Sequence, residues 1–307
     1  MDDFGVPLLR DPKIALPESV ALPKKKVGPL HRVEFVVEMA GPRTATAAAV
    51  SRLLDYDWYT ALGHPRLWGM RPSDETWQPL AASHDGAYDS VALSYPMVRL
   101  DGKLDVGSAL RVEERANEFA TLINRRAIGV PKASEVGAIA RDLENIRDNL
   151  DAGVSFAFSP SRGRVLEKDL WIIFAAMGLQ FGSSGNFEYR PFGADRGLFE
   201  ALPIGGASEK FSLASVQAGA QHEGVSLGFR LPTCPNPIRA IEGLLRTGRA
   251  LCERVGGRLL DEDSRFVDGK IAQRAINDVT AADATLRRAG IEPGSAEAIL
   301  LWEGPEA

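Results

Sequence analysis

Hydrophobic and polar residues alternate in a short stretch near the start of each half of the chain. In VEFVVEM (residues 33–39), Val33, Phe35 and Val37 fall on one face and the two glutamates fall on the other. Such alternation predicts a strand with one buried face. VSFAFSP (residues 154–160) repeats the pattern. In both halves a polar loop and an amphipathic segment follow, which predicts a helix packed against a sheet.

The order of predicted elements in the first half returns in the second half. LWGMRP (residues 67–72) corresponds to NFEYRP (186–191), and VALSY (91–95) corresponds to VSLGF (225–229). The long helix before NRRAIGV corresponds to the one before GGRLL, and the last helices also align. We therefore predict a tandem duplication, with residues 31–152 as a shorter, degenerate first repeat and residues 153–290 as the second.

Each repeat is predicted to be an α+β unit of the split β-α-β type, a mostly antiparallel sheet with its helices packed on one face. Asn236 and Pro237 favour the start of the longest helix of the second repeat, and Gly256 favours its end. The predicted buried stripe of this helix is Ile238, Ile241, Leu245, Cys252 and Val255. Because the helices occupy one face, the opposite sheet face is left for solvent or a partner.

The second repeat is longer than the first within residues 197–224. LFEALPI, a Gly-Gly turn and KFSLASV predict two strands joined by a hairpin in this segment. The second repeat should therefore have the wider sheet, and a function of the sheet face is better placed there. Outside the repeats, the proline-rich residues 1–30, with three consecutive lysines, predict an extended linker or arm, and residues 291–307 form a C-terminal tail.

Composition narrows the possible functions. A hydrophobic content of 45% and a charged content of 25% are those of a soluble globular protein. A net charge of −5 gives no general attraction for nucleic acid or an anionic membrane surface. The longest apolar run, WIIFAAMGL, is too short to span a bilayer. Two cysteines make no disulfide framework, which favours a reducing, cytoplasmic compartment.

The residues that usually carry catalysis are scattered. The four histidines, at positions 31, 64, 84 and 222, have no metal-ligand spacing. Cys234 lies in a proline-rich turn without a neighbouring base, and IGGASEK lacks the spacing of a phosphate-binding loop. The sequence therefore predicts a non-enzymatic protein without a metal or a cofactor.

The second repeat resembles the C-terminal FtsZ-binding domain of the ZipA family of bacterial division proteins. The residues that carry the resemblance are FSLA (211–214), GVSLGFRLP (224–232), VGG (255–257), LDED (260–263) and the final helix within residues 270–290. The first repeat resembles the family only through its match to the second.

The resemblance implies a division-ring adaptor that binds the C-terminal tail peptide of FtsZ in a shallow apolar groove on the exposed sheet face. The groove residues that it implies are Val154 on the first strand, Phe187 and Tyr189, then Ala214 and Val216, and finally Ser226 and Gly228. Where the family has a large aromatic residue, this chain has Gly228, and Phe229 compensates if the register slips by one residue.

The resemblance also implies a place at the division site, on the cytoplasmic side of the inner membrane. The family has an N-terminal transmembrane helix that ties the ring to the membrane. We expect such an anchor to have been removed here, with the lysine- and proline-rich start as the surviving linker.

Two other readings stay open at this point. The first is an enzyme or haem-binding protein with a duplicated α+β fold, in which one histidine would ligate iron. The second is a purely structural module, whose groove is filled by the first repeat or by the N-terminal arm.

Overall fold

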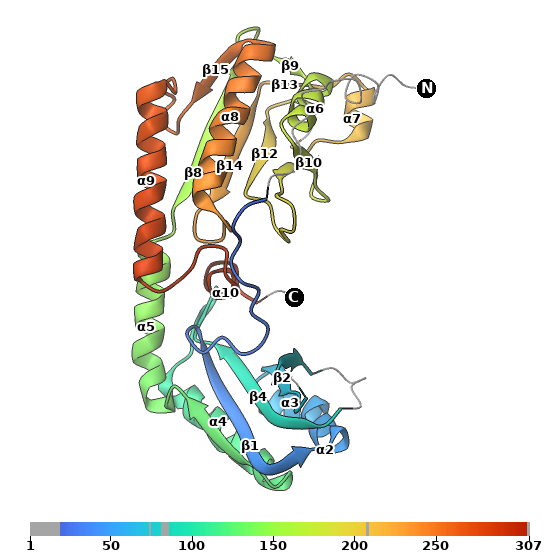
Figure 1. Cartoon of the computed structure of the whole chain (residues 1–307), viewed down its shortest axis with the longest axis vertical. Coiled ribbons are helices and arrows are strands. Elements are labelled where there is room, and N and C mark those ends of the chain that lie inside the picture. Colours follow the sequence, from blue (N-terminus) through green and yellow to red (C-terminus); the bar gives the residue numbers. More distant parts are fainter. Residues whose placement is uncertain (1–18, 74, 81–85, 207–208, 306–307) are drawn as a thin grey trace. The chain divides into compact units, whose positions relative to one another are not determined.

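The computed structural model describes residues 19–73, 75–80, 86–206 and 209–305 (Figure 1). The chain divides into two compact units. The N-terminal unit holds Lys24–Asn149 and the segment from Ser295 onward, and the C-terminal unit holds Leu150–Gly294 and the arm up to Pro23. Both contain helices and antiparallel sheets, so the predicted α+β class is confirmed. The first eighteen residues of the predicted arm lie outside the described residues.

The N-terminal unit is built on a sheet of five strands in the order β3-β2-β4-β1-β7. Its elements are β1 (Glu34–Ala45), α2 (Ala47–Ser51), the 3-10 helix η1 (Arg52–Leu54), α3 (Tyr56–Ala61), β2 (Arg66–Met70), β3 (Trp77–Pro79), β4 (Tyr88–Pro96), β5 (Val98–Arg99), β6 (Gly102–Lys103), α4 (Val106–Leu122), β7 (Arg126–Val130), α5 (Ala133–Asn149) and α10 (Ala296–Glu303). Helix α10, within the predicted C-terminal tail, packs against α5, and Trp302 Nε1 donates to the carbonyl oxygen of Arg147 at 3.2 Å.

The first part of strand β1, residues 34–37, is buried on both of its faces. Phe35, Val37 and Met39 fill the predicted core face, which helix α4 contacts. On the other face, Glu34 is fully buried, although it was predicted to lie on the polar side of the strand. Its Oε1 atom accepts hydrogen bonds from Arg66 and from Ser94, each at 2.9 Å. A buried carboxylate is stable only when it is paired in this way.

The C-terminal unit has a sheet of six strands in the order β10-β11-β12-β14-β8-β15, and every neighbouring pair is antiparallel. Its elements are β8 (Gly153–Pro160), β9 (Val165–Leu166), α6 (Glu167–Ala176), β10 (Leu179–Phe181), β11 (Phe187–Tyr189), β12 (Phe199–Ile204), α7 (Leu213–Gln217), β13 (Gln221–His222), β14 (Gly224–Arg230), α8 (Pro237–Val255), β15 (Gly257–Leu260) and α9 (Gly269–Arg288). Helix α8 contacts β8, β14 and β15 along one face of this sheet (Figure 1).

The second of the two strands predicted within residues 197–224 is a helix. LFEALPI does form strand β12, but residues 213–217 form helix α7. The Oγ atom of Ser212 accepts from the backbone N–H of Ser215, and the Ser215 side chain accepts from the backbone N–H of Ser212. This reciprocal capping box satisfies N–H groups that a strand would have to pair with a neighbour, so it starts a helix despite the alternating pattern.

Helix α8 begins and ends where the sequence predicts, but it buries a different stripe. Asn236 caps the helix by accepting from the N–H of Arg239, and Gly256 ends it. The buried residues are Pro237, Ala240, Ile241, Gly243, Leu244, Thr247, Gly248 and Leu251, whereas Ile238, Leu245, Cys252 and Val255 are only partly buried. A Cβ atom on Gly243 would lie 2.9 Å from a ring atom of Phe199, so the small residues allow the helix to approach the sheet closely.

The two sheets share part of their topology. In the N-terminal unit, the first strand β1 lies between β4 and β7. In the C-terminal unit, the first strand β8 lies between β14 and β15 in the same way. In both units the long helix, α4 or α8, comes between the two outer strands along the chain. The predicted match of LWGMRP to NFEYRP does not hold in position, since β2 lies next to β4 whereas β12 separates β11 from β14. The tandem duplication therefore stays a prediction.

Candidate peptide-binding face

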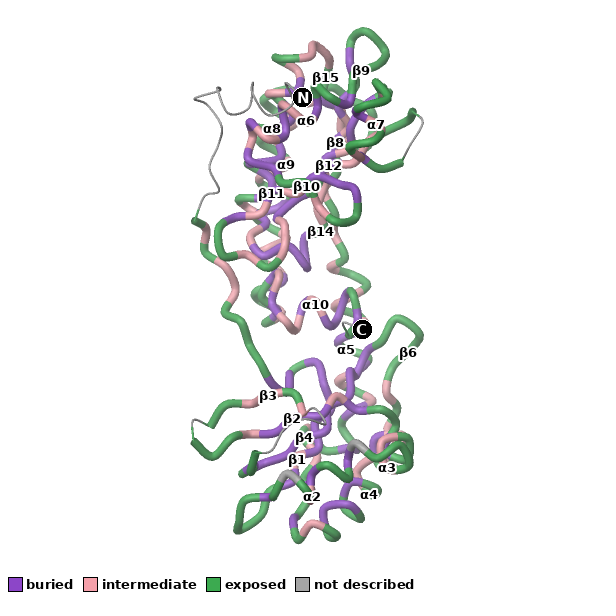
Figure 2. The backbone as a smooth tube through the Cα atoms, turned by 90° about the vertical axis from the view of Figure 1, so that its right-hand side faces the viewer, coloured by how far each residue is buried: buried purple, intermediate pink, exposed green. Residues whose placement is uncertain are grey.

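The C-terminal sheet has one face packed under helices and one open face. Along β8, Phe156 and Phe158 are buried while Ser155 and Ser159 are exposed. Along β14, Val225 and Leu227 are buried while Ser226 and Gly228 are partly exposed. Figure 2 colours the backbone by burial and shows buried stretches beside intermediate and exposed ones in this unit. The polar and small residues therefore define the open face.

A row of mostly apolar residues crosses the open face. The register pairs Leu202 of β12 with Ser226 of β14, Ser226 with Ala157 of β8, and Ala157 with Leu260 of β15. Each of the four is partly exposed. Beside Leu202, Ile204 lies on the same face with 37% of its surface exposed. The row thus has aliphatic side chains at both ends and small side chains between them.

The next row begins with acidic residues and ends with small ones. Glu188 pairs with Glu200, Glu200 with Gly228, and Gly228 with Ser155. The carboxylate of Glu188 accepts from Arg190 at 2.7 Å, and that of Glu200 accepts from the amide of Asn186 at 2.7 Å. Both carboxylates are held in place. Arg190 balances the charge of Glu188, whereas Glu200 accepts from a neutral amide and puts negative charge at a fixed corner of the face.

A shallow depression of about 280 Å³ lies over the small residues, and we call it the face hollow. Ser155, Ser226 and Gly228 line it, together with Glu200 and Leu202. Gly153, Val154, Phe229, Arg230 and Glu262 complete the lining. A Cβ atom on Gly228 would lie 2.9 Å from the carbonyl oxygen of Val154, so the backbone itself forms the floor at this point.

Three of the predicted groove residues line the face hollow. Ser226 and Gly228 lie on the open face as expected. The side chain of Val154 instead lies on the helix side of β8, with Phe156, and Val154 borders the hollow through its backbone carbonyl. The register does not slip, because Phe229 pairs with Val154 and alternates with Gly228. The ring of Phe229 therefore belongs to the helix side of the sheet and does not replace the missing aromatic on the open face.

The predicted placement of Phe187 and Tyr189 in the groove is wrong. Each is only 3% exposed, and both lie on the helix side of β11, with Glu188 on the open side between them. The ring centroid of Phe187 lies 4.9 Å from that of Trp171. Tyr189 stacks on Phe199 at 5.4 Å. Aromatic side chains stabilise the fold most when they are fully buried, so both rings lie on the helix side of the sheet.

Ala214 and Val216 also lie elsewhere than predicted. They belong to helix α7 rather than to a strand, and Val216 is 8% exposed while Ala214 is exposed. The strand that separates β11 from β14 is β12, so Glu200, Leu202 and Ile204 take their place on the face. The alternation in FEALPI, together with its pairing to the GVSLG strand, would have indicated these residues.

Glu167 and His222 form a buried polar pair away from the open face. The Nε2 atom of His222 lies 2.8 Å from Oε2 of Glu167, and Nδ1 lies 3.0 Å from the carbonyl oxygen of Gly205. Ser215 donates its hydroxyl to Glu167 at 2.8 Å rather than to the histidine. A nucleophilic serine needs contact with the base, so this group is arranged as a structural clasp between α6, α7 and β13.

The described part of the chain was also compared with the features of a metal site and of a membrane span. Within residues 19–73, 75–80, 86–206 and 209–305, no cluster of histidine, cysteine and acidic residues could hold a metal ion. None of the helices described there has both the length and the apolar character needed to cross a membrane. His84, considered above as a scattered histidine, lies outside these residues.

The geometry defines a class of domain, an antiparallel sheet that is covered by helices on one side and offers a partly apolar groove on the other. Residues 156–276 match the family model of the ZipA C-terminal, FtsZ-binding domain. The resemblance predicted for the second half is thus confirmed, and the matched family is one of protein-binding domains in cell division. The match does not include the first half. A comparison with curated proteins gives no match to the chain.

Proposed function

We propose that the C-terminal unit binds the C-terminal tail of FtsZ on its open sheet face and works as a non-enzymatic adaptor of the division ring. The observation that carries this proposal is the apolar row from Leu202 to Leu260 beside the face hollow, within the segment that matches the FtsZ-binding family. We also propose that the chain acts with other division-ring proteins on the cytoplasmic side of the inner membrane, and so helps link the ring to that membrane.

The form of the hollow suggests how the tail would bind. The floor over Gly228, Ser155 and Ser226 carries little side-chain bulk. A large apolar side chain of the tail can therefore rest in the hollow, with Leu202 beside it. Glu200 lies on the rim and favours a tail segment that carries a basic residue next to the apolar one. Binding at one such site would be modest, and many tails in one filament would strengthen it.

The test is a titration of the full chain with a synthetic peptide of the FtsZ C-terminal tail. Leu202→Glu places a charge in the apolar row, so we expect at least an about tenfold loss of affinity. The matched control is Leu213→Glu, which changes an exposed leucine of the same unit outside the row and should bind as the wild type does.

Two outcomes would contradict the proposal. Equal binding by the wild type and Leu202→Glu would remove the open face as the site. No binding of the tail to the wild type, even at about millimolar peptide, would remove FtsZ as the ligand and favour a structural role for the unit.

A further inference from the structure

Strand β8 has an incomplete outer edge. On one side it pairs with β14 from residue 153 to residue 158, but on the other side β15 pairs with it only from residue 157 to residue 160. After Leu260 the chain turns back, and Leu260 bridges Phe266. In the described part of the chain, residues 153–156 therefore have no strand beside them on the outer side.

The backbone groups of this edge point outward at Gly153 and Ser155. The N–H of Leu231 donates to the carbonyl oxygen of Ala152 at 2.8 Å, so Ala152 faces β14. Backbone groups in an antiparallel strand alternate in direction, so those of Val154 also face β14 and those of Gly153 and Ser155 face away from it. Two residues thus offer N–H and C=O groups to a further strand.

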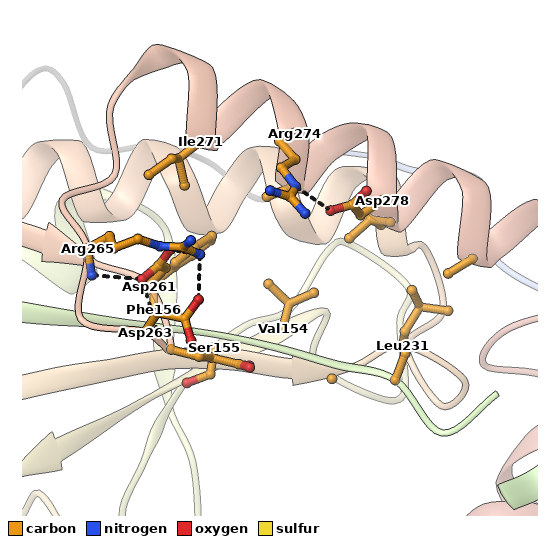
Figure 3. A pocket seen from close by; sticks show the side chains of 16 residues that line it. Val154, Ser155, Phe156, Leu231, Asp261, Asp263, Arg265, Ile271, Arg274 and Asp278 are labelled. Atoms are coloured by element: carbon orange, nitrogen blue, oxygen red, sulfur yellow. Dashed lines mark hydrogen bonds and ion pairs between the residues drawn. The ribbon is translucent and has the colours of Figure 1, made fainter. Parts of the chain in front are cut away.

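A hollow of about 310 Å³ lies directly beside this edge, between β8 and helix α9, and we call it the edge hollow (Figure 3). Figure 3 shows Val154 pointing from the strand toward α9. The larger apolar residues that line the hollow are Val154, Phe156, Leu231, Ile271 and Val279, and Ala152, Ala275 and Ala282 complete its apolar lining. A segment that paired with the strand edge would therefore find an apolar space for its side chains.

The rim of the edge hollow is acidic. Asp261, Glu262, Asp263 and Asp278 line it against only Arg265 and Arg274. Arg265 contacts Asp261 at 2.8 Å and Asp263 at 2.6 Å, and Arg274 contacts Asp278 at 3.6 Å. These ion pairs use both arginines, and Glu262, which is exposed and also lines the face hollow, belongs to none of them. The excess negative charge favours a basic residue in a guest.

We propose that the edge hollow is a second peptide site, which takes an extended segment as an added strand. The segment pairs with the outward backbone N–H and C=O groups of Gly153 and Ser155. It places an aliphatic side chain in the edge hollow between β8 and α9, and a lysine or arginine next to Glu262. Main-chain hydrogen bonds supply affinity in this mode, and alternate side chains supply specificity. The site is distinct from the open face, because it uses the edge of the sheet and the helix side.

The test uses a defined probe, a capped peptide of alternating valine and threonine with one lysine near its end. We expect it to bind the full chain and to slow hydrogen exchange at the Ser155 amide. N-methylation of the peptide backbone on its pairing edge should abolish binding, since it removes the strand donors. Replacing the lysine with glutamate should weaken binding by about fivefold or more.

Variants of the chain locate the site. Glu262→Lys should lower the affinity for the probe peptide by about fivefold or more. The matched control Glu253→Lys, at an exposed glutamate of α8, should leave this affinity unchanged. Ala275→Phe fills the edge hollow and should abolish binding, whereas Leu202→Glu on the open face should not affect it.

Several results would overturn the proposal. These are an unprotected Ser155 amide at about millimolar probe, binding that survives N-methylation, or loss of binding in Leu202→Glu but not in Ala275→Phe. The last result would place the probe on the open face. A failure of the edge site leaves FtsZ-tail binding untouched, because Leu202→Glu reports on that function separately.

Discussion

The Nε2 atom of His222 lies 2.8 Å from the Oε2 atom of Glu167, and both side chains are fully buried. A carbonyl oxygen can only accept, so Nδ1 of the histidine donates to Gly205. The second ring nitrogen, Nε2, then faces a carboxylate oxygen of Glu167. The other carboxylate oxygen accepts from Ser215, from the backbone of Ser212 and from Trp171.

Removing either partner of this pair should destabilise the C-terminal unit strongly. His222→Leu leaves the Oε2 atom of a buried carboxylate without its partner, and Glu167→Gln removes the charge that the ring faces. We expect each to lower the free energy of unfolding by about 3–5 kcal/mol. Urea unfolding of the full chain, followed by circular dichroism, measures the change.

The control for this pair is Glu242→Gln. It breaks an exposed ion pair with Arg239 on α8, whose side chains are 46% and 56% exposed, and should cost less than about 1 kcal/mol. If the buried and exposed variants lost the same stability, the clasp between α6, α7 and β13 would have no special role.

Filling the face hollow should separate binding from stability. Ser155→Leu adds an aliphatic side chain over Gly228 at a position where the side chain already points to solvent, so we expect FtsZ-tail affinity to fall by at least about tenfold with stability unchanged within about 0.5 kcal/mol. Isothermal titration and urea unfolding measure the two quantities.

Gly228→Ala is the contrasting variant for the same hollow. Its new Cβ atom would meet the Val154 carbonyl oxygen, so it should lower stability by about 1 kcal/mol or more. A tail that bound Ser155→Leu as tightly as the wild type would show that the hollow is not the binding site.

The elements whose ends carry local signals could be predicted from the sequence. Asn236 and Pro237 start α8, Gly256 ends it, and the alternation of β8 and β14 gives both strands and their buried faces. These signals act within a few residues, so the sequence contains them in full. Helix α7 is the exception, since its pair of capping serines outweighed an alternating pattern.

The stripe that α8 buries depends on its partner rather than on its own periodicity. Gly243 and Gly248 lie on the buried side because Phe199 and Leu259 approach the helix there. The hydrophobic spacing predicts instead that Leu245 and Cys252 are buried, because the periodicity of a helix is read from its larger apolar residues. A close helix-to-sheet contact favours small residues, and the sequence alone does not tell which strand supplies the contact.

The candidate face was predicted only in part for a similar reason. The order Phe187, Glu188, Tyr189 already separates two aromatics from one charge, and burial of the aromatics follows from it. Their assignment to the groove came from the family resemblance instead. Leu202 and Leu260 join the face only through the pairing of β12, β14, β8 and β15, which requires knowledge of the register.

Arg125 should be essential for the N-terminal unit. Its guanidinium donates to the carbonyl oxygens of Met39, Arg43, Tyr88 and Asp89 at 2.7–3.0 Å, which ties the ends of β1 and β4 together. Burial lowers the pKa of Arg125, so the contacts must offset a desolvation cost. In Arg125→Lys, the lysine side chain cannot reach all four acceptors, so we expect the free energy of unfolding to fall by at least about 2 kcal/mol.

Hydrogen exchange of amides in β1 and β4 measures the effect of Arg125→Lys. Exchange there should become faster, because the strand ends open more often. The control is Arg115→Lys, at an exposed arginine paired with Glu118 on α4, and it should leave exchange unchanged. Equal protection in both variants would contradict the role given to Arg125.

The buried thiol of Cys234 should make stability depend on pH in the alkaline range. Burial raises its pKa from 9.0 to about 12, and its Sγ donates to the carbonyl oxygen of Leu198 at 3.3 Å. Between these two pKa values the unfolded chain loses the thiol proton while the folded chain keeps it, so stability falls as pH rises.

Cys234→Ala removes this loss but adds a cavity cost that does not vary with pH. The stability difference between the wild type and the variant should therefore shrink by about 1 kcal/mol between about pH 8.5 and pH 10, measured by urea unfolding. Parallel stability curves would show that the thiol ionises equally easily in both states.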